Sequence, residues 1–454
     1  MYYMLSFHKP EDIILYWDEP TISLDYESHE IHGIIQNNWA KNTIPNIILS
    51  SATLPSIDLI PNCKMSFKFN HPTGIIEKIN SFDCKKTISI ISPKGDIVMP
   101  HTHYSESSKL KKSLEHIQSF RTVLRHLNVT EITKFLITSQ NYISDELHID
   151  NYFKRIEDIT ITNIKLYYLS CMEQLSDKWE KYYDLFKKEQ AYKSTIYLTT
   201  SDAITITGPT IFLTNNIEKV SKFYLQQSKI PEGELSRIND IMAYNNKLSN
   251  SIEKLNRQLN INDDKEEKNE LTSEQKEALR EIKDLQLKKK EITLSKIYVP
   301  NSREHIYKYH KTLIQGLFTS SLTEYDIENV VLLHVNDSIK LLLLMGIGIF
   351  DETLPMEYLE VMKKFAYHQK LYLIIASSDY IYGTNYQFCH GYLSVDLVSM
   401  TQEKVIQCLG RVGRGNKRQN YTIRIRDEGF ITKLFEEETN KIEATNMNKL
   451  FTDF

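Results

Sequence analysis

The sequence predicts an α/β protein whose core is built from parallel β-sheets. Short apolar runs such as IILYW (13–17) and NIILS (46–50) end abruptly in polar residues, which is typical of buried parallel strands. Stretches with apolar residues at helical spacing, such as VSKFYLQQ and YLEVMKKFAYH, lie between several of these runs. Strands that alternate with helices form parallel sheets, which bind their ligands at the carboxyl ends of the strands.

Further apolar runs of the same kind predict the other strands. These are residues 87–91, 195–200, 210–214, 329–335, 371–376 and 421–426. Residues 104–190 break the alternation, because their pattern is mostly helical, with Lys, Glu and Tyr throughout.

Residues 237–296 are expected to form a helical hairpin. Each arm carries apolar residues at three- and four-residue spacing, and a polar loop, NINDDKEEKNE, separates the arms. Thr272 and Gln275 offer a capping box for the second arm. The hairpin either packs on itself as an inserted coiled coil or grips a partner or nucleic acid, for which the lysines at 288–290 would serve.

Composition places the chain among ordinary soluble proteins. Of its 454 residues, 41% are hydrophobic and 25% are charged, which excludes wholesale disorder, a collagen-like fibre and a disulfide-stapled mini-protein. No apolar run approaches the ~20 residues that cross a bilayer, and the amino terminus has no signal-peptide pattern. With a net charge of -4, any nucleic-acid binding needs a local basic surface. The 5 cysteines form no CxxC pair, which fits a reducing compartment and argues against a zinc site.

The most specific string is QCLGRVGRG, from Gln407 to Gly415. Its two arginines, Arg411 and Arg414, stand three positions apart and share one face if this stretch is helical. Guanidinium groups beside glycines, where the backbone can approach a ligand closely, suit a phosphate chain that gains charge during transfer. The alternative is a basic turn on the surface.

A second polar segment follows the strand expected at 371–376. Ser377 and Ser378 come first, and Gly383, Thr384 and Asn385 form a turn shortly afterwards. Hydroxyl groups and backbone amides at the end of a strand can hold nucleic-acid phosphates. We therefore expect a phosphate-side loop here, ahead of the arginine motif.

An acid pair, Asp18-Glu19, follows the first expected strand, and Ser51-Ala52-Thr53 follows the second. In a site that hydrolyses nucleotides, an aspartate at a strand end holds Mg²⁺ and an adjacent glutamate activates water. Two acids in an ordinary turn remain the alternative. Asp351-Glu352 also ends an apolar run, but no SAT follows it, so we favour Asp18-Glu19. The pairs His29/His32 and His101/His103 have metal-compatible spacing without a third ligand, and we expect surface or turn histidines.

These strings together resemble a known family. DEP (18–20), SAT (51–53), TIFLTNN (210–216), SSDYIYGTN (377–385) and QCLGRVGR (407–414) stand in the order of motifs II to VI of the superfamily 2 DExH/DEAD-type helicases. The stretch from 341 to 385 looks most like the RNA-translocase branch, and the Asn-, Ile- and Lys-rich style is similar to helicases of giant DNA viruses. The resemblance covers residues 13–55 and about 194–426.

The resemblance implies a role for each matching residue. Asp18 would hold Mg²⁺, and Glu19 would be the base that activates water. Ser51 and Thr53 would couple nucleotide state to the nucleic-acid groove, while Gly383 and Asn385, with Ser377 and Ser378, would lie along the strand path. Gln407 would sense the nucleotide, and Arg411 and Arg414 would act as arginine fingers. ATP and Mg²⁺ are the implied cofactors.

Three departures from the family pattern stand out. Position 21 is Thr where a DEAH protein has His, and Asn385 stands where many members have Asp. No G-x-x-x-x-G-K-[ST] string, whose backbone amides and lysine cradle phosphates, occurs in the sequence. We therefore expect the carboxyl-terminal two-thirds of a helicase core, from a split gene, a misassigned start or a degraded relic.

The implied fold is a set of RecA-like parallel sheets, with a partial first domain, a complete second domain and helical insertions. The expected division assigns residues 1–103 to the first domain, 104–190 to a helical connector, 191–430 to the second domain and 431–454 to a tail. The expected function is ATP-dependent translocation along nucleic acid, RNA rather than DNA. The alternative is a truncated, non-catalytic module that binds nucleic acid or completes another subunit. The expected partners of the chain are nucleic acid and a polypeptide that supplies the P-loop, and no membrane is expected. The expected location is the cytoplasm, a virus factory or a virion.

Overall fold

The computed structural model describes residues 2–80, 82, 84–187, 203–263, 273–310, 315–381, 386–414 and 420–452. It confirms the α/β class with parallel sheets. One sheet has two strands, β1 (Ile14–Asp18) and β2 (Asn46–Ser50). The other sheet has six strands in the order β3-β8-β7-β4-β6-β5, and the pairings within it are parallel.

The chain forms two compact units. The first combines residues 1–194, 210–215 and 377–454, and the second combines residues 195–209 and 216–376. The first unit therefore holds both the amino-terminal acid pair and the arginine motif, although nearly 400 residues separate them in sequence.

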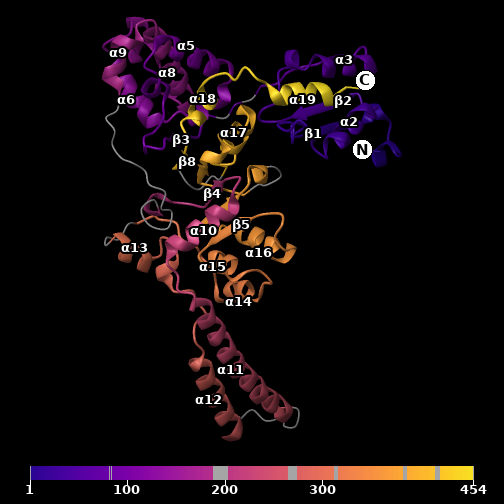
Figure 1. Ribbon diagram of the computed structural model, residues 1–454, viewed down its shortest axis with the longest axis vertical. Coiled ribbons are helices and arrows are strands. Elements are labelled where there is room, and N and C mark those ends of the chain that lie inside the picture. The colour runs from indigo at the N-terminus through magenta and orange to yellow at the C-terminus, as the bar shows by residue number, and fades with distance from the viewer. Residues whose placement is uncertain are drawn as a thin grey trace. The chain divides into compact units, whose positions relative to one another are not determined.

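The two-stranded sheet of the first unit is covered on one face by helices. The covering helices are α2 (His32–Ala40), α3 (Pro61–Asn70) and α19 (Ile442–Leu450), which lie together in Figure 1. Trp39, Met447 and Phe451 lie at the centre of this core, and the Phe451 ring packs on Trp39 and Trp17. The segment 431–454, expected as a tail, thus supplies buried side chains because its apolar residues close this core.

The opposite face of the same sheet is uncovered among the described residues. Ile14, Tyr16 and Ile48 are 66%, 58% and 46% exposed. The strands at 13–17 and 46–50 are confirmed in position and in parallel register, and the strand at 13–17 is covered on one face rather than buried on both. Only one face of it has partners, so alternate residues stay exposed.

The larger sheet contributes four strands to the first unit. These are β3 (Ile88–Ile91), β4 (Thr210–Leu213), β7 (His390–Leu393) and β8 (Tyr421–Ile425). β3 lies in the segment assigned to the first domain, yet it pairs with β8. The helices α17 (Gln402–Leu409) and α18 (Gly429–Phe435) follow β7 and β8 in the chain.

Helices dominate the described part of 104–190, as the pattern predicts. The longer ones are α5 (Ser107–Ser119), α6 (Val129–Ser139), α8 (Ile161–Ser176) and α9 (Trp179–Phe186). Asn128 and Thr160 cap α6 and α8 by accepting hydrogen bonds from the backbone amides three residues on. Buried Tyr167 and Tyr168 fill the interior of this bundle, so these tyrosines are core residues. Short α-helices complete the first unit at α1 (Tyr2–Leu5), α4 (Pro100–His103) and α7 (Ile149–Tyr152).

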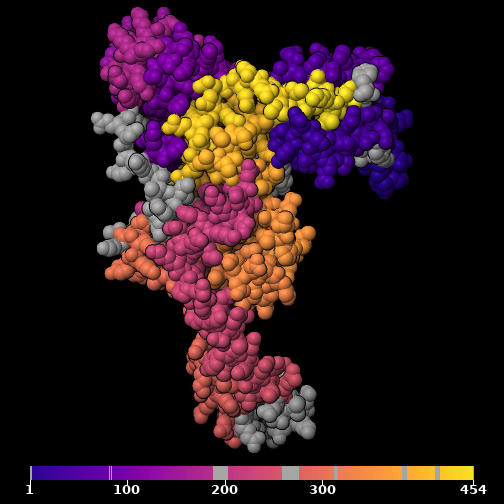
Figure 2. Space-filling view, viewed as in Figure 1, coloured from indigo at the N-terminus to yellow at the C-terminus, as the bar shows by residue number. Residues whose placement is uncertain are grey.

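The second unit carries the expected hairpin. α11 (Glu234–Asp263) and α12 (Ser273–Lys288) run side by side and form a narrow stalk (Figures 1 and 2). The Asn245 side chain closes the base of the hairpin through hydrogen bonds with the backbone N–H and C=O of Lys290. Thr272 and the Gln275 side chain lie outside the described residues, so the expected capping box stays a prediction.

The rest of the second unit surrounds two parallel strands, β5 (Ile347–Phe350) and β6 (Leu373–Ala376). Its other helices are α10 (Ile217–Ser228), α13 (Arg303–His310), α14 (Glu324–Leu332), α15 (Asp337–Leu344) and α16 (Met356–Tyr367). The strand expected at 329–335 was wrong. Thr323 and Asp326 form a capping box that starts α14, and this helix takes up most of the β-branched run.

Two further expectations concern strands. The apolar run that ends in Asp351-Glu352 contains β5, so Asp351 does follow a strand. The strand expected at 195–200 lies outside the described residues. In the described part of the chain, no helix is both long enough and apolar enough to span a membrane.

Candidate functional site

The acid pair lies at the carboxyl end of β1. Asp18 is the last residue of that strand and stands opposite Ser50 of β2, so the parallel register brings the segments after both strands together. Glu19 has a left-handed backbone (φ 49°), which costs a residue with a side chain about 1–2 kcal/mol. Its N–H donates to the carbonyl of Ser50 at 2.7 Å, which holds this strained turn in place. We call residues 18–26 the acid loop.

Ser51 connects the acid loop to the end of β2. Its hydroxyl donates to Glu19 Oε2 at 2.8 Å and lies 3.2 Å from the Thr21 hydroxyl. The backbone N–H of Thr53 donates to Ser51 Oγ at 3.2 Å. The acid pair and the SAT string, expected at one site, are thus in direct contact through Glu19.

Gln407 of α17 reaches the same place from the arginine motif. Its Nε2 donates to Thr53 Oγ1 at 2.7 Å and lies 3.4 Å from Thr21 Oγ1. The side chain is buried, and its Oε1 has no hydrogen-bond partner in the described structure. An unpaired buried acceptor costs about 1–3 kcal/mol, so this oxygen is available to a donor on a ligand or a water molecule.

The two arginines do not share a helix face. α17 ends at Leu409, Gly410 follows it, and both arginines lie in the turn beyond. Arg411 is buried, whereas Arg414 is exposed and its Nε donates to the carbonyl of Gly410 at 3.1 Å. Gly413 between them has φ 79°, and a Cβ there would lie 2.9 Å from Ile88 Cδ1. The turn therefore needs glycine at position 413, and α17 has already ended at Leu409, before both arginines.

Only the start of the expected phosphate-side loop lies among the described residues. Ser377 follows β6, and the buried Ser378 begins a short 3₁₀ turn, Ser378–Ile381. We call residues 377–381 the hydroxyl turn. Gly383 and Asn385 lie outside the described residues, as does Gly415.

A buried lysine, which the sequence did not single out, joins the acid loop to the hydroxyl turn. Lys404 Nζ lies 2.6 Å from Asp25 Oδ2 and 2.8 Å from Asp379 Oδ1. Burial lowers the pKa of this ammonium, but its hydrogen bonds to Asp25 and Asp379 outweigh burial and raise the pKa overall. Lys404 stands three residues before Gln407 on the same helix. This spacing places both side chains on one face of the helix and is the sequence signal that points to Lys404.

Asp18 has the properties of a single carboxylate ligand for Mg²⁺. Its side chain is exposed at a strand end, whereas the Glu19 carboxylate is engaged by Ser51. Mg²⁺ is commonly held by one or two carboxylates together with water and substrate phosphates. No group of three or more His, Cys, Asp or Glu with metal-binding geometry occurs among the described residues.

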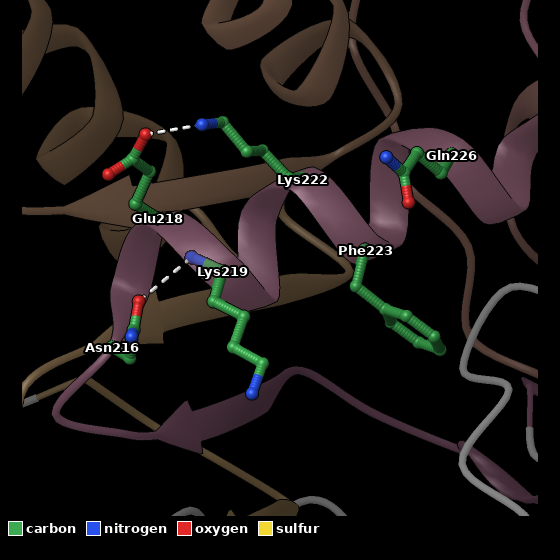
Figure 3. A pocket seen from close by; sticks show the side chains of 6 residues that line it. All are labelled: Asn216, Glu218, Lys219, Lys222, Phe223 and Gln226. Carbon is green, nitrogen blue, oxygen red and sulfur yellow. Dashed lines mark hydrogen bonds and ion pairs between the residues drawn. The ribbon is translucent and has the colours of Figure 1, made fainter.

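A separate surface hollow runs along α10 in the second unit. Figure 3 shows its lining side chains, which all come from this helix and its cap: Asn216, Glu218, Lys219, Lys222, Phe223 and Gln226. Lys222 pairs with Glu218 at 2.5 Å, and Asn216 accepts a hydrogen bond from the backbone of Lys219. None of the residues expected at the nucleotide site lines this hollow.

No protein-family model matches the chain, and no curated protein sequence matches it. The geometry of the site thus carries the functional argument.

Proposed function

We propose that the chain is the motor part of an ATP-driven translocase of the superfamily 2 helicase type, which moves along nucleic acid, RNA rather than DNA. One observation carries the proposal. Gln407, from the arginine motif, donates a 2.7 Å hydrogen bond to Thr53 of the SAT string, which itself contacts the acid loop. Three short motifs that are far apart in sequence thus meet at one set of side chains within one compact unit.

The residues at this place would supply part of the chemistry of phosphoryl transfer to water, a ligand for Mg²⁺ and a base, without a P-loop string in the chain. Asp18 would bind Mg²⁺, which when bound neutralises phosphate charge. Glu19 would accept the proton of the attacking water, and the Ser51 hydroxyl fixes the position of its carboxylate. Arg411 and Arg414 would stabilise the charge that develops in the transition state.

Nucleic acid would contact the hydroxyl turn through the half-buried Ser377, whereas Ser378 is buried and would contribute only through its place in the turn. Phosphate contacts from hydroxyls and backbone amides carry no sequence information, so binding is expected to be independent of base sequence. Its affinity should fall as salt rises, because counterions are released when phosphates are neutralised. The cytoplasm, a virus factory or a virion would suit such an activity.

A second function is favoured by the bare face of the two-stranded sheet. Ile14, Tyr16 and Ile48 leave one face of a parallel sheet uncovered, and parallel sheets are normally covered on both faces. The chain would then be a non-catalytic module that binds nucleic acid or completes another polypeptide, including one that supplies a P-loop.

ATP hydrolysis by the purified chain, with and without single-stranded RNA, separates the two functions. A translocase motor that works by itself should show RNA-stimulated turnover that falls roughly 100-fold or more in Glu19→Gln and in Arg411→Ala, whereas a chain that needs a P-loop from another polypeptide should show none. Glu11→Gln is the matched control, because Glu11 is exposed ahead of the same strand. Turnover equal to that of Glu19→Gln, together with retained binding of poly(U), would replace the translocase with the binding module.

A further inference from the structure

We propose that Lys404 is a positioning residue that fixes the acid loop and the hydroxyl turn to each other, so that a change at one is transmitted to the other. The bridge itself is independent of the proposed function. The role that we assign to the bridge is to let nucleic acid at the hydroxyl turn act on the nucleotide site, and this role rests on the proposed function.

The Lys404 ammonium contacts three groups from two segments. Asp25 and Tyr26 belong to the acid loop, and Asp379 belongs to the hydroxyl turn. Nζ lies 2.6 Å from Asp25 Oδ2, 2.8 Å from Asp379 Oδ1 and 3.3 Å from the Tyr26 hydroxyl. An ammonium has three donors, and each of these contacts takes one. Arginine, with a planar fork, does not reproduce this arrangement.

Burial makes the Lys404–Asp25 contact of this bridge costly to break. The Lys404 side chain is 2% exposed and that of Asp25 is 9% exposed, whereas that of Asp379 is 55% exposed. Charges that are withdrawn from water interact more strongly and are costly to separate. The Tyr26 hydroxyl also donates to Asp379 at 3.2 Å, and the Lys404 ammonium lies 4.8 Å from the Tyr26 ring centroid.

The acid loop is held at both ends around this bridge. Asn446 of α19 donates to the carbonyls of Leu24 and Tyr26 at 2.8 and 3.0 Å. One turn along α17, Gln407 holds Thr21. A displacement of Asp379 therefore acts on Lys404, then on α17, and then on the hydroxyls beside Glu19. The bridge gives the hydroxyl turn a direct mechanical connection to the proposed catalytic base.

Hydrogen exchange of the full chain, measured by mass spectrometry on peptides covering 19–26 and 377–381, tests the bridge. The amides of Leu24 and Tyr26 donate within the acid loop, and that of Tyr380 donates within the hydroxyl turn, so both peptides hold protected reporters. Asp379→Asn is expected to speed exchange in the acid loop about threefold or more, and Asp25→Asn to do the same in the hydroxyl turn.

A double-mutant cycle distinguishes transmission from local loosening. In a Lys404→Met background, the effect of Asp25→Asn on the hydroxyl turn should disappear, because the bridge is already broken. Lys94→Met removes a surface ion pair with Glu428 and is the matched control. If each substitution alters only its own peptide, or if the effects add, the proposal is wrong. If Lys404→Met does not fold, the exchange of the acid loop in the single variant Asp379→Asn tests the bridge. This variant removes a half-exposed carboxylate and leaves Asp25 paired with Lys404.

The connection to function has its own readout. With poly(U) bound, the acid loop of the wild type should exchange more slowly, and Asp379→Asn should lose most of this protection while it still binds poly(U). The ratio of RNA-stimulated to basal ATP hydrolysis should fall in the same variant. A chain that neither binds poly(U) nor hydrolyses ATP would overturn the proposed function. The double-mutant cycle, measured by hydrogen exchange, would still test whether Lys404 joins the acid loop to the hydroxyl turn.

Discussion

Replacing Glu443 by glutamine should change how the stability of the protein depends on pH. Glu443 of α19 is 1% exposed, and its Oε1 accepts a hydrogen bond from Thr401 Oγ1 at 2.9 Å. Its Oε2 has no partner in the described structure. Burial, followed by the nearby Glu403 and Asp25, raises the pKa of this carboxyl to about 8, against the opposing effects of Thr401 and Lys404.

The size of the effect on stability follows from the difference between the pKa of the Glu443 carboxyl in the folded protein and its pKa in the unfolded chain. In the unfolded chain the carboxyl has a pKa of 4.5, so between pH 4.5 and about 8 the folded protein holds a proton that the unfolded chain has lost. Stability therefore falls as pH rises through this window. At 1.36 kcal/mol for each pKa unit, the loss is about 1 kcal/mol at pH 5 and about 4 kcal/mol at pH 8.

Glutamine has the shape of the protonated carboxyl and no charge to bury. Glu443→Gln should thus be more stable than the wild type, and its advantage should grow by about 3 kcal/mol between pH 5 and pH 8. For a unit of this size that corresponds to roughly 5–10 °C in Tm.

Thermal and urea unfolding at pH 5, 6, 7 and 8 measure this advantage. Glu437→Gln is the matched control, because Glu437 is exposed and lies only six residues away. It should shift stability by a small amount with little dependence on pH. An advantage of Glu443→Gln that is constant across the four pH values, or that shrinks toward pH 8, would refute the argument from burial.

Three further substitutions test the fold around the site, each by urea unfolding unless stated otherwise. Gly413→Ala should cost about 1–3 kcal/mol, because φ is 79° and the new Cβ would meet Ile88, whereas Gly33→Ala in α2, with open space at its Cβ, should be neutral or stabilising. Gln407→Leu takes the donor from the Thr53 hydroxyl but also removes the unpaired Gln407 Oε1, so its net cost should stay below about 2 kcal/mol and should fall further in a Thr53→Val background; equal costs in both backgrounds would argue against the bond. Ile48→Thr should leave stability within about 0.5 kcal/mol, since the side chain is 46% exposed, and should reduce self-association in sedimentation if the bare sheet face is adhesive.

Apolar runs predicted strands well where the run was long enough to be distinctive. The strands near residues 46, 88, 210, 373 and 421 all form within the predicted runs. β7 (His390–Leu393) was missed because HGYL contains a histidine and a glycine, neither typical of a strand, although all four residues are buried. The run at 329–335 became helix because the capping box at Thr323 lies upstream of the β-branched residues, outside the window that suggested a strand.

The candidate site was partly predictable because parallel strand ends meet at one edge of a sheet. That rule brings the segments after β1 and β2 together, and the contact from Ser51 to Glu19 follows from it. The environment of the arginines did not follow, because a helix spacing was assumed where Gly410 and Gly413 end the helix. The spacing of Lys404 and Gln407 indicates a shared helix face, but the partners of Lys404 were not predictable from sequence. Its partners lie 379 and 25 positions away, and only the folded first unit brings them together.

α17 has two roles, because it packs against the core and also positions side chains at the acid loop. One side of this helix packs Val405, Ile406 and Leu409 into the core, and the other side presents Lys404 and Gln407 to the acid loop. The Thr401 side chain caps the first turn, and the same hydroxyl donates to Glu443. Because the helix has only 8 residues, its position depends on this cap and on the core rather than on its own helical stability. Anything that shifts α17 therefore moves Gln407 and Lys404 together, and the hydroxyls beside Glu19 move with them.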